Sequence, residues 1–579
     1  MLNGLNSLRK KFHYFVTFGL ALIGGASAGR ATAAVTYYRD VLPVVLKACA
    51  SCHRPGQTGP FSLVDYGSSA KHAEVIFRKT QDRSMPPWLV DPVCGEFAGR
   101  RPLTEQEIRL FASWVEDGAT AGNPAEAPPL PKWTEGWQSG KPDLVVRMPR
   151  AFPVAAGSKD IYRNFTVPIP LDRPRYVRAV EFRPGNARLV HHAFVYVDSS
   201  GASRAFDGRD GDPGYTYAMK PLTVKMPAGQ FLTWQPGKAG ASGDDQLPWL
   251  LGTNTDLVLA LHLIGATNAQ SVQSEVGIYF TDKPPTVTAF KLGLMSFNID
   301  IPPLATNYVV EDTFTLPADV EAWAVLPHAH RLATTLEGWA VLPDGSRRWL
   351  MRIPRWDFNW QGDYKYANPL PLPKGTVLTM RYLFDNPPRT SPSGGPLLAP
   401  TRVRYGPQTS DEMAELWLQL VLRDPNDLPL LEEAQRLHSI QLSEVAARAR
   451  LAADPGDTQG KLDLGRVMLS RKGGLSQAEQ IFRSVVTTAP ENAQGHYYLG
   501  LVLRTGDRQE EARKEFEATV RINPEDYKAY GNLGLIAMEL GDRPGAIRAF
   551  ETALKLNPAD ELSKDALSDL TQPSATQKP

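Results

Sequence analysis

Four prolines near the C-terminal end recur at almost constant spacing: Pro455, Pro490, Pro524 and Pro558 lie 35, 34 and 34 residues apart. A glycine, an alanine and a phenylalanine recur before the last three of them, as Gly465, Ala478 and Phe482, Gly500, Ala512 and Phe516, and Gly534, Ala546 and Phe550. Small residues let paired helices approach closely, and phenylalanine fills the space between them. The pattern predicts an α-solenoid of three repeats, which is the minimum for a stable stack.

The period resembles that of tetratricopeptide repeats, which we place at residues 456–560. We expect a helical linker over 425–455 and a disordered tail over 561–579. The resemblance implies a concave surface for a protein partner, with a purely structural cap as the alternative.

The first 34 residues are typical of a signal peptide. They contain a basic cluster at Arg9–Lys11, an apolar stretch at Phe15–Ile23 and small residues that end at Ala34. The apolar stretch is short for a bilayer, so we expect a periplasmic or secreted protein, with an uncleaved anchor as the alternative and no stable membrane span later in the chain. Without this segment the net charge of +1 becomes about −3, and nothing indicates a nucleic-acid partner.

A haem-attachment motif follows at Cys49-Ala50-Ser51-Cys52-His53. In C-x-x-C-H sequences both thiols bond to the haem vinyl groups and the histidine ligates the iron. A redox dithiol or a zinc half-site is the alternative, but export places the chain where haem is attached. We therefore expect one covalently bound haem c on Cys49, Cys52 and His53.

Residues 35–122 resemble bacterial single-haem cytochrome c domains, which are all-α. A helical pattern at Tyr37–Ala48 leads into the motif, and a later helix at Thr104–Gly118 opens with a capping box between Thr104 and Glu107. The resemblance implies a second axial ligand.

Met85 is the candidate for that ligand, and the prolines after it stiffen its loop. The alternative is a packing methionine. His72 is a competitor that we expect at the surface, and Cys94 has no assigned role.

A proline-rich linker over 123–142 ends this domain. From 143 to 424 the chain changes to short apolar or alternating runs separated by Gly, Pro, Asn and Asp, which is typical of β-sandwiches. We place one sandwich at 143–284 and a second at 285–424.

Three histidine motifs lie in this β-rich segment. His328 and His330 are two residues apart, so an extended strand projects both from one face toward a shared metal. His191 and His192 are adjacent, so ligation of one metal by both requires a bulge or a twist; otherwise one of them is a packing residue. His262 lies in an apolar run, where an unpaired imidazole is costly to bury.

These motifs resemble the copper type II, ascorbate-dependent monooxygenases, the family of peptidylglycine hydroxylase and dopamine hydroxylase. The resemblance is carried, in the family's order, by Val190-His191-His192-Ala193, Leu261-His262-Leu263, Pro327-His328-Ala329-His330-Arg331 and Ser410-Asp411-Glu412-Met413. It implies two tandem jelly-roll-like sandwiches with one copper ion on each.

The resemblance also implies a division of labour. An electron-transfer copper would be bound by His191, His192 and His262. A catalytic copper bound by His328, His330 and Met413 would take O2 and hydroxylate a substrate C–H bond; a soft methionine sulfur favours Cu(I).

Departures from the family concern the substrate. The β-rich segment contains no cysteine, whereas the animal enzymes have several disulfides. Where peptide-amidating members hold the peptide carboxylate with an arginine, an asparagine and a tyrosine, this chain has Leu326, Glu415 and Trp417. A glycine-extended peptide is therefore not expected, and the substrate class stays open between small molecules and other peptides.

The expected function is an exported copper monooxygenase in which the fused haem, reduced by an external donor, takes the place of ascorbate and feeds the three-histidine copper. The alternative is a non-catalytic electron-transfer or copper-handling protein that its repeats dock onto a partner.

Overall fold

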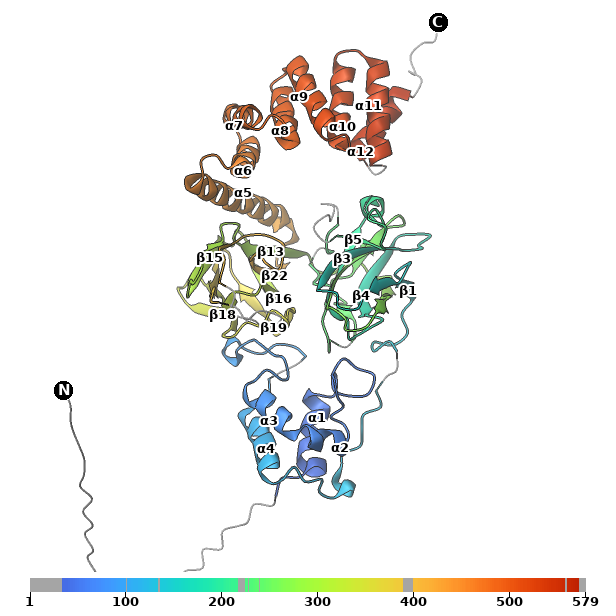
Figure 1. The fold of residues 1–579 in the computed structure, drawn as a ribbon, viewed down its shortest axis with the longest axis vertical. Coiled ribbons are helices and arrows are strands. Elements are labelled where there is room, and N and C mark those ends of the chain that lie inside the picture. Colours follow the sequence, from blue (N-terminus) through green and yellow to red (C-terminus); the bar gives the residue numbers. More distant parts are fainter. Residues whose placement is uncertain are drawn as a thin grey trace, which may run out of the picture.

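The computed structural model describes residues 34–99, 102–133, 136–216, 224–227, 229–238, 240–388, 399–557 and 560–571. The expected signal peptide lies outside the described residues up to position 33. A helical N-terminal region lies at one end of the molecule, two pairs of β-sheets lie side by side in the middle, and an arm of helices lies at the other end (Figure 1). No described helix has both the length and the apolar character needed to cross a membrane.

The N-terminal region contains a π-helical turn η1 (Tyr37–Val41) and helices α1 (Leu42–Ala48), α2 (Tyr66–Lys71), α3 (Ala73–Gln81) and α4 (Glu105–Glu116). Tyr37, Phe111 and Trp114 are fully buried in its core. The predicted capping box is confirmed, because the Thr104 amide donates to Glu107 Oε2 at 2.8 Å and the Glu107 amide donates to Thr104 Oγ1 at 3.2 Å. α2 and α3 were not predicted.

Residues 88–98 leave this region and pack against the second sheet pair. The Asp91 amide donates to the Arg352 carbonyl at 2.8 Å, and the Ala98 amide donates to the Lys365 carbonyl at 2.7 Å. Cys94, in the short helix η2 (Pro92–Cys94), is buried in that pair's core, and burial raises the pKa of its thiol to about 12. The expected cytochrome segment 35–122 therefore contributes part of its chain to a neighbouring core.

The N-terminal sheet pair consists of two five-stranded antiparallel sheets around one core. One sheet has the order β1-β12-β4-β8, with β9 also on β4, and the other has the order β6-β3-β10-β5-β7; β2 and β11 form a small ribbon. The strands are β1 (Leu144–Arg147), β2 (Phe152–Val154), β3 (Ile161–Pro168), β4 (Arg175–Arg183), β5 (Val190–Asp198), β6 (Tyr215–Thr216), β7 (Thr233–Trp234), β8 (Ser242–Gly243), β9 (Trp249–Leu251), β10 (Asp256–Leu263), β11 (Gln270–Val272) and β12 (Glu275–Thr281).

The C-terminal sheet pair has two four-stranded antiparallel sheets, with the orders β13-β22-β16-β19 and β15-β20-β17-β18, and a ribbon of β14 and β21. Its strands are β13 (Ala289–Met295), β14 (Asp300–Ile301), β15 (Tyr308–Thr315), β16 (Val320–Ala329), β17 (Ala333–Val341), β18 (Arg347–Ile353), β19 (Tyr364–Leu372), β20 (Val377–Phe384), β21 (Val403–Arg404) and β22 (Ala414–Leu422). The prediction of a large β-rich middle region is confirmed.

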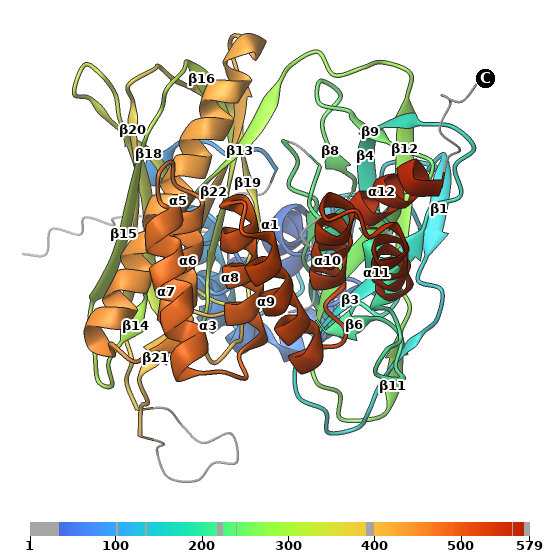
Figure 2. The same cartoon turned by 90° about the horizontal axis from the view of Figure 1, so that it is seen from above.

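The C-terminal arm contains α5 (Leu428–Ala453), α6 (Thr458–Leu469), α7 (Leu475–Thr488), α8 (Ala493–Thr505), α9 (Gln509–Ile522), α10 (Tyr527–Glu539), α11 (Arg543–Leu556) and α12 (Glu561–Thr571). Figure 2 shows the arm passing over both sheet pairs. The recurring glycines pack as predicted: a Cβ atom on Gly465, Gly500 or Gly534 would lie 2.5, 2.9 or 2.6 Å from the Cε1 atom of Phe482, Phe516 or Phe550. Pro558 lies outside the described residues.

The prediction of a disordered tail from residue 561 is wrong for Glu561–Thr571, which form α12. Ser563 of α12 is fully buried, and Leu562 and Ser563 lie over Gly531 of α10. The end of a helical stack needs a terminal helix to cover its last apolar face.

Helix α5 fixes the arm to the C-terminal sheet pair. Leu431 is fully buried in that pair's core. Gln435 exchanges two hydrogen bonds of 3.2 Å with the backbone of Gly293 in β13, and His438 Nε2 lies 2.9 Å from Asp312 Oδ2 in β15. The arm is therefore joined to the sheets by side-chain contacts as well as by the chain itself.

Candidate metal centre

A bulge brings the two adjacent histidines to one place. His192 pairs with His262 across β5 and β10, and Val190 pairs with Leu263, so His191 is the extra residue between them. An extra residue on one strand turns its side chain toward the face of its neighbour. The bulge that adjacency required is confirmed.

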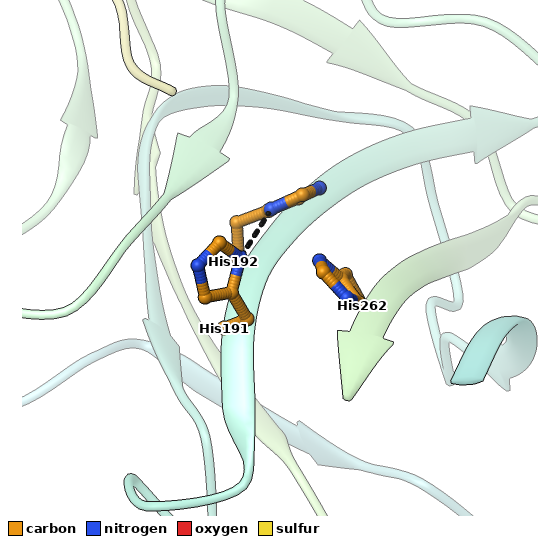
Figure 3. A group of neighbouring side chains, drawn as sticks. All are labelled: His191, His192 and His262. Atoms are coloured by element: carbon orange, nitrogen blue, oxygen red, sulfur yellow. Dashed lines mark hydrogen bonds between the residues drawn. The ribbon is translucent and has the colours of Figure 1, made fainter. Parts of the chain in front are cut away.

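The three imidazoles converge from two neighbouring strands (Figure 3). Their ring centroids lie 5.3 Å apart for His191 and His192, 4.6 Å for His191 and His262, and 4.9 Å for His192 and His262. The Nδ1 atoms of His191 and His192 are 3.1 Å apart, and one ligand atom from each of the three residues lies within 4.8 Å of the others. This is the spacing of nitrogens that share one ion.

His262 supplies an independent indication of a ligand. It is 2 % exposed, its Nδ1 has no hydrogen-bond partner among the described residues, and its Nε2 lies 3.3 Å from Asp160 Oδ2 without a well-aligned hydrogen bond. A buried polar atom without a partner is costly. A bound cation would satisfy one of these nitrogens, so the residues fit a metal.

Burial keeps all three imidazoles neutral, which is the form that ligates metals. Burial first, and then the neighbouring His191, lowers the pKa of His262 to about 4. Burial and the neighbouring histidines also hold the pKa of His192 well below its usual range, and burial lowers the pKa of His191.

The second histidine set lies at the end of β16. The rings of His328 and His330 are 5.3 Å apart, as expected for alternate residues on one face. His328 Nδ1 lies 2.5 Å from Gln361 Oε1, and His330 Nδ1 lies 3.0 Å from the Asp411 carbonyl oxygen. With both Nδ1 atoms donating, the Nε2 atoms remain for a metal.

The backbone around this set is held by Glu412, which is fully buried. Its carboxylate accepts from the amides of His330, Leu332 at 2.8 Å and Met413 at 2.9 Å. One carboxylate thus fixes the strand end that carries His330 and the residue that carries the candidate sulfur ligand.

Both histidine sets border one cavity of about 460 Å³ between the sheet pairs. His192 and His262 line one side, and His328, His330 and Met413 line the other. The wall is largely apolar and aromatic, and the other lining residues include Tyr162, Phe194, Tyr196, Met226, Phe231, Leu326, Phe358, Glu415 and Trp417. The structure therefore brings five of the six predicted copper ligands to one cavity, and the sixth, His191, has its ring centroid 4.6 Å from that of His262.

The three residues at which the sequence departs from the peptide-amidating enzymes also line this cavity. Leu326, Glu415 and Trp417 all line it, and Trp417 Nε1 donates to Glu415 Oε2 at 2.9 Å. The cavity wall therefore carries an apolar side chain at Leu326 and a carboxylate, hydrogen-bonded to an indole, at Glu415.

The loop between β18 and β19 contacts both histidine sets. The Phe358 ring centroid lies 6.3 Å from that of His262 and 5.9 Å from that of His330. Trp356 Nε1 donates to the His330 carbonyl at 3.0 Å. One ring, that of Phe358, therefore lies next to a histidine of each set.

The sequence did not single out Phe358, Trp356 or Gln361. A loop aromatic carries no periodicity, and no motif marks Gln361. A search for polar residues able to hold the outer nitrogen of His328 could have proposed Gln361 among many others.

The haem motif adopts a helical turn at the end of α1. The His53 amide donates to the Cys49 carbonyl at 2.9 Å, and His53 Nδ1 lies 3.0 Å from the Phe61 carbonyl oxygen, which leaves Nε2 for iron. Gly59 was not predicted, yet a Cβ there would lie 2.8 Å from His53 Nδ1.

Cys49 and Cys52 are thiols that form no disulfide among the described residues. Burial raises the pKa of the Cys49 thiol to about 12.

Met85 borders a separate cavity of about 650 Å³ with Leu103, Ile108 and Pro354. None of Cys49, Cys52 and His53 is among the described residues that line it. The competitor His72 is only partly buried; it stacks on Phe61 with centroids 3.9 Å apart, and its Nδ1 lies 2.8 Å from the Ser68 carbonyl oxygen.

Comparison with known proteins identifies the C-terminal arm. Residues 468–527 and 527–560 match models of the tetratricopeptide repeat. The arm therefore contains tetratricopeptide repeats, as the proline spacing predicted. No curated protein matches the chain.

Two solved structures similar to this chain are crystal structures of MamA. Both are 21 % identical with a TM-score of 0.22; one covers 25 % of this chain and 82 % of MamA, and the other covers 24 % and 75 %.

Proposed function

We propose that this chain is an exported copper-dependent monooxygenase that hydroxylates a C–H bond with O2. The two sheet pairs would be the tandem jelly-roll-like sandwiches of the copper type II monooxygenases. The observation that carries the proposal is that two members of a converging three-histidine set, and a His-x-His set with a methionine, line one cavity of about 460 Å³.

The residues divide the work between the two sides. His191, His192 and His262 would hold one copper ion, and His328, His330 and Met413 would hold the other. Bound copper supplies one-electron chemistry and O2 activation. Gln361 and the Asp411 carbonyl orient the two imidazoles of the second set, which a preorganised site requires.

The cavity wall would exclude water and orient the substrate. Phe194, Phe231, Leu326 and Trp417 form an apolar lining that favours a hydrophobic substrate portion near Met413. The paired Glu415 and Trp417 disfavour a terminal carboxylate, so the substrate would be a small molecule or a peptide without a free carboxylate at the reacting end.

The N-terminal region would be a cytochrome c domain that delivers electrons from an external donor. Cys49 and Cys52 would attach the haem, and His53 and Met85 would be its axial ligands. The region touches both sheet pairs: Thr58 Oγ1 donates to the Ala187 carbonyl at 3.1 Å, and Arg355 donates to the Asp82 carbonyl. These contacts between the N-terminal region and both sheet pairs support the proposal that this region is the electron donor.

The decisive experiment loads the full chain with copper and measures O2 uptake by the reduced protein against panels of exported metabolites and peptides. We expect two copper ions per chain and substrate-dependent uptake. Met413→Ala should abolish uptake and leave both the haem spectrum and the three-histidine copper signal intact. Two bound copper ions that stay inert toward O2 with every substrate class would contradict the proposal.

A second function is favoured by the tetratricopeptide repeats, which commonly bind proteins. In this reading the chain is an electron-transfer or copper-handling protein that passes electrons to a partner held by the arm. Copper that is reduced by the haem but does not react with O2, together with a partner whose binding is lost when 468–560 is deleted, would support it.

A further inference from the structure

A carboxylate outside every predicted motif touches the three-histidine set. Asp160 lies in the loop before β3, and its Oδ2 atom is 3.3 Å from His262 Nε2. The His262 ring also stacks on Tyr162, with centroids 4.1 Å apart and planes inclined by 14°. The stacking on Tyr162 restricts the tilt of the His262 ring. The contact with Asp160 fixes the side of the ring on which Nε2 lies.

The same Asp160 oxygen meets a cation from the other sheet pair. Arg331 Nη2 lies 3.4 Å from Asp160 Oδ2, and Arg331 directly follows His330. The guanidinium carbon also lies 5.3 Å from the centroid of Phe358, the ring that contacts both His262 and His330. Asp160 therefore stands between an imidazole of one set and the residue next to an imidazole of the other.

We propose that Asp160 is a positioning residue for the three-histidine metal site. It holds the His262 ring by Nε2, while the ring centroid lies 4.6 Å from that of His191 and 4.9 Å from that of His192. A carboxylate on the outer nitrogen of a ligating histidine fixes the ring and raises its basicity. This inference rests on the metal site of the proposed function.

Arg331 gives the arrangement a second consequence. Because Arg331 belongs to the C-terminal sheet pair, docking of the two sheet pairs brings a cation to the carboxylate that orients His262. The three-histidine site therefore has a contact from the other sheet pair in its surroundings, although all three of its ligands belong to one sheet.

The competing explanation is that Asp160 only joins the sheet pairs through Arg331. Two variants separate these roles. Asp160→Asn removes the charge from both contacts, whereas Arg331→Gln removes the ion pair and leaves the carboxylate on His262. Asp245→Asn is a matched control, because Asp245 makes an exposed pair with Arg178 on the same sheet pair at 3.6 Å.

The test uses the full chain carrying His328→Ala and His330→Ala, so that only the three-histidine site is titrated. Copper(II) affinity is measured by chelator competition, and the ligand field is measured by electron paramagnetic resonance. We expect Asp160→Asn to weaken binding about 10- to 100-fold and to change the hyperfine splitting. Asp160→Glu should recover most of the affinity, Arg331→Gln should lower it less than Asp160→Asn does, and Asp245→Asn should leave it unchanged.

Equal affinity and an identical spectrum in Asp160→Asn would overturn the inference, and so would equal losses in Asp160→Asn and Arg331→Gln. Asp160→Ser serves if Asp160→Asn is poorly folded by circular dichroism. If the chain with the His328→Ala and His330→Ala changes binds no copper, or binds it equally well after His192→Ala, the proposed metal site itself fails, and that outcome is distinct from failure of the positioning role.

Discussion

The two histidine sets face one cavity but are held in different ways. In the His-x-His set each Nδ1 has an acceptor at 3.0 Å or less, and Glu412 accepts from three backbone amides around it. In the three-histidine set the rings contact one another edge to face, and His262 has no well-aligned hydrogen bond. The His-x-His set is therefore held by hydrogen bonds to backbone and side-chain acceptors, whereas the rings of the three-histidine set are held mainly by one another and by the contact of His262 with Asp160.

The largest expected effect is the loss of one copper ion when one histidine set is disrupted. His262→Ala should remove the three-histidine copper, lower the copper content from two ions to one and leave the His-x-His copper in place. Metal analysis combined with electron paramagnetic resonance checks this. His496→Asn is the control, since His496 pairs with Glu515 in the arm at 2.6 Å, and it should keep both ions. Loss of both ions in His262→Ala would show that the sets are not separable.

Acid should destabilise the copper-free chain through both sets. The pKa of His262 and that of His330 are each lowered to about 4, mainly by burial. The unfolded chain takes up these protons near the ordinary pKa of about 6.5, so the unfolded state binds more protons between pH 6.5 and 4. Stability should therefore be full above pH 6.5, fall as the pH drops toward 4 and level off below it.

Between pH 6.5 and pH 4, each of these two histidines should lower the free energy of unfolding by on the order of 3 kcal/mol. Urea unfolding of copper-free protein at pH 7 and pH 4.5 measures the loss, and His262→Gln should reduce the pH dependence. A free energy of unfolding that does not change over this range would contradict the expected neutral imidazoles.

The His-x-His set should depend on its buried carboxylate for stability. Glu412→Gln replaces a charged acceptor of three amide hydrogen bonds and should lower the free energy of unfolding by about 2–3 kcal/mol. Urea unfolding of the full chain measures it. Asp245→Asn, which removes an exposed pair with Arg178, should cost about 1 kcal/mol or less. Equal effects of the two changes would mean that Glu412 does not organise the strand end.

The smallest expected effect concerns the contact between Gln361 and the Nδ1 atom of His328. Gln361→Ala should weaken copper at the His-x-His set about tenfold, because His328 loses the acceptor that fixes its ring. Chelator competition in a His262→Ala background isolates this site. An affinity within twofold of the parent would show that His328 is held by its strand alone.

The sequence predicted those parts of both sets that follow from local geometry. Alternation along a strand placed His328 and His330 on one face, and adjacency required the bulge that now places His191 beside His262. In the arm, the fixed period predicted the contacts of Gly500 with Phe516 and its equivalents. In each case a single strand or a single helical repeat determines the result.

Contacts between distant segments could not be predicted in this way. Asp160 and His262 are separated by 102 positions, and Asp160 lies in a loop without periodicity. Residues 88–98 carry no strand alternation, yet they dock on β18 and β19 through their backbone. The helix α12 was missed because its need arises from the exposed end of the stack rather than from its own sequence. These features depend on how the regions pack.

The attachment of α5 has a mechanical consequence. Gln435 is bonded to Gly293 of β13, Gly293 is paired with Trp417 of β22, and β22 begins directly after Met413. A force on the repeats is therefore carried along α5, across one strand pairing, to the strand whose first neighbour is the candidate sulfur ligand.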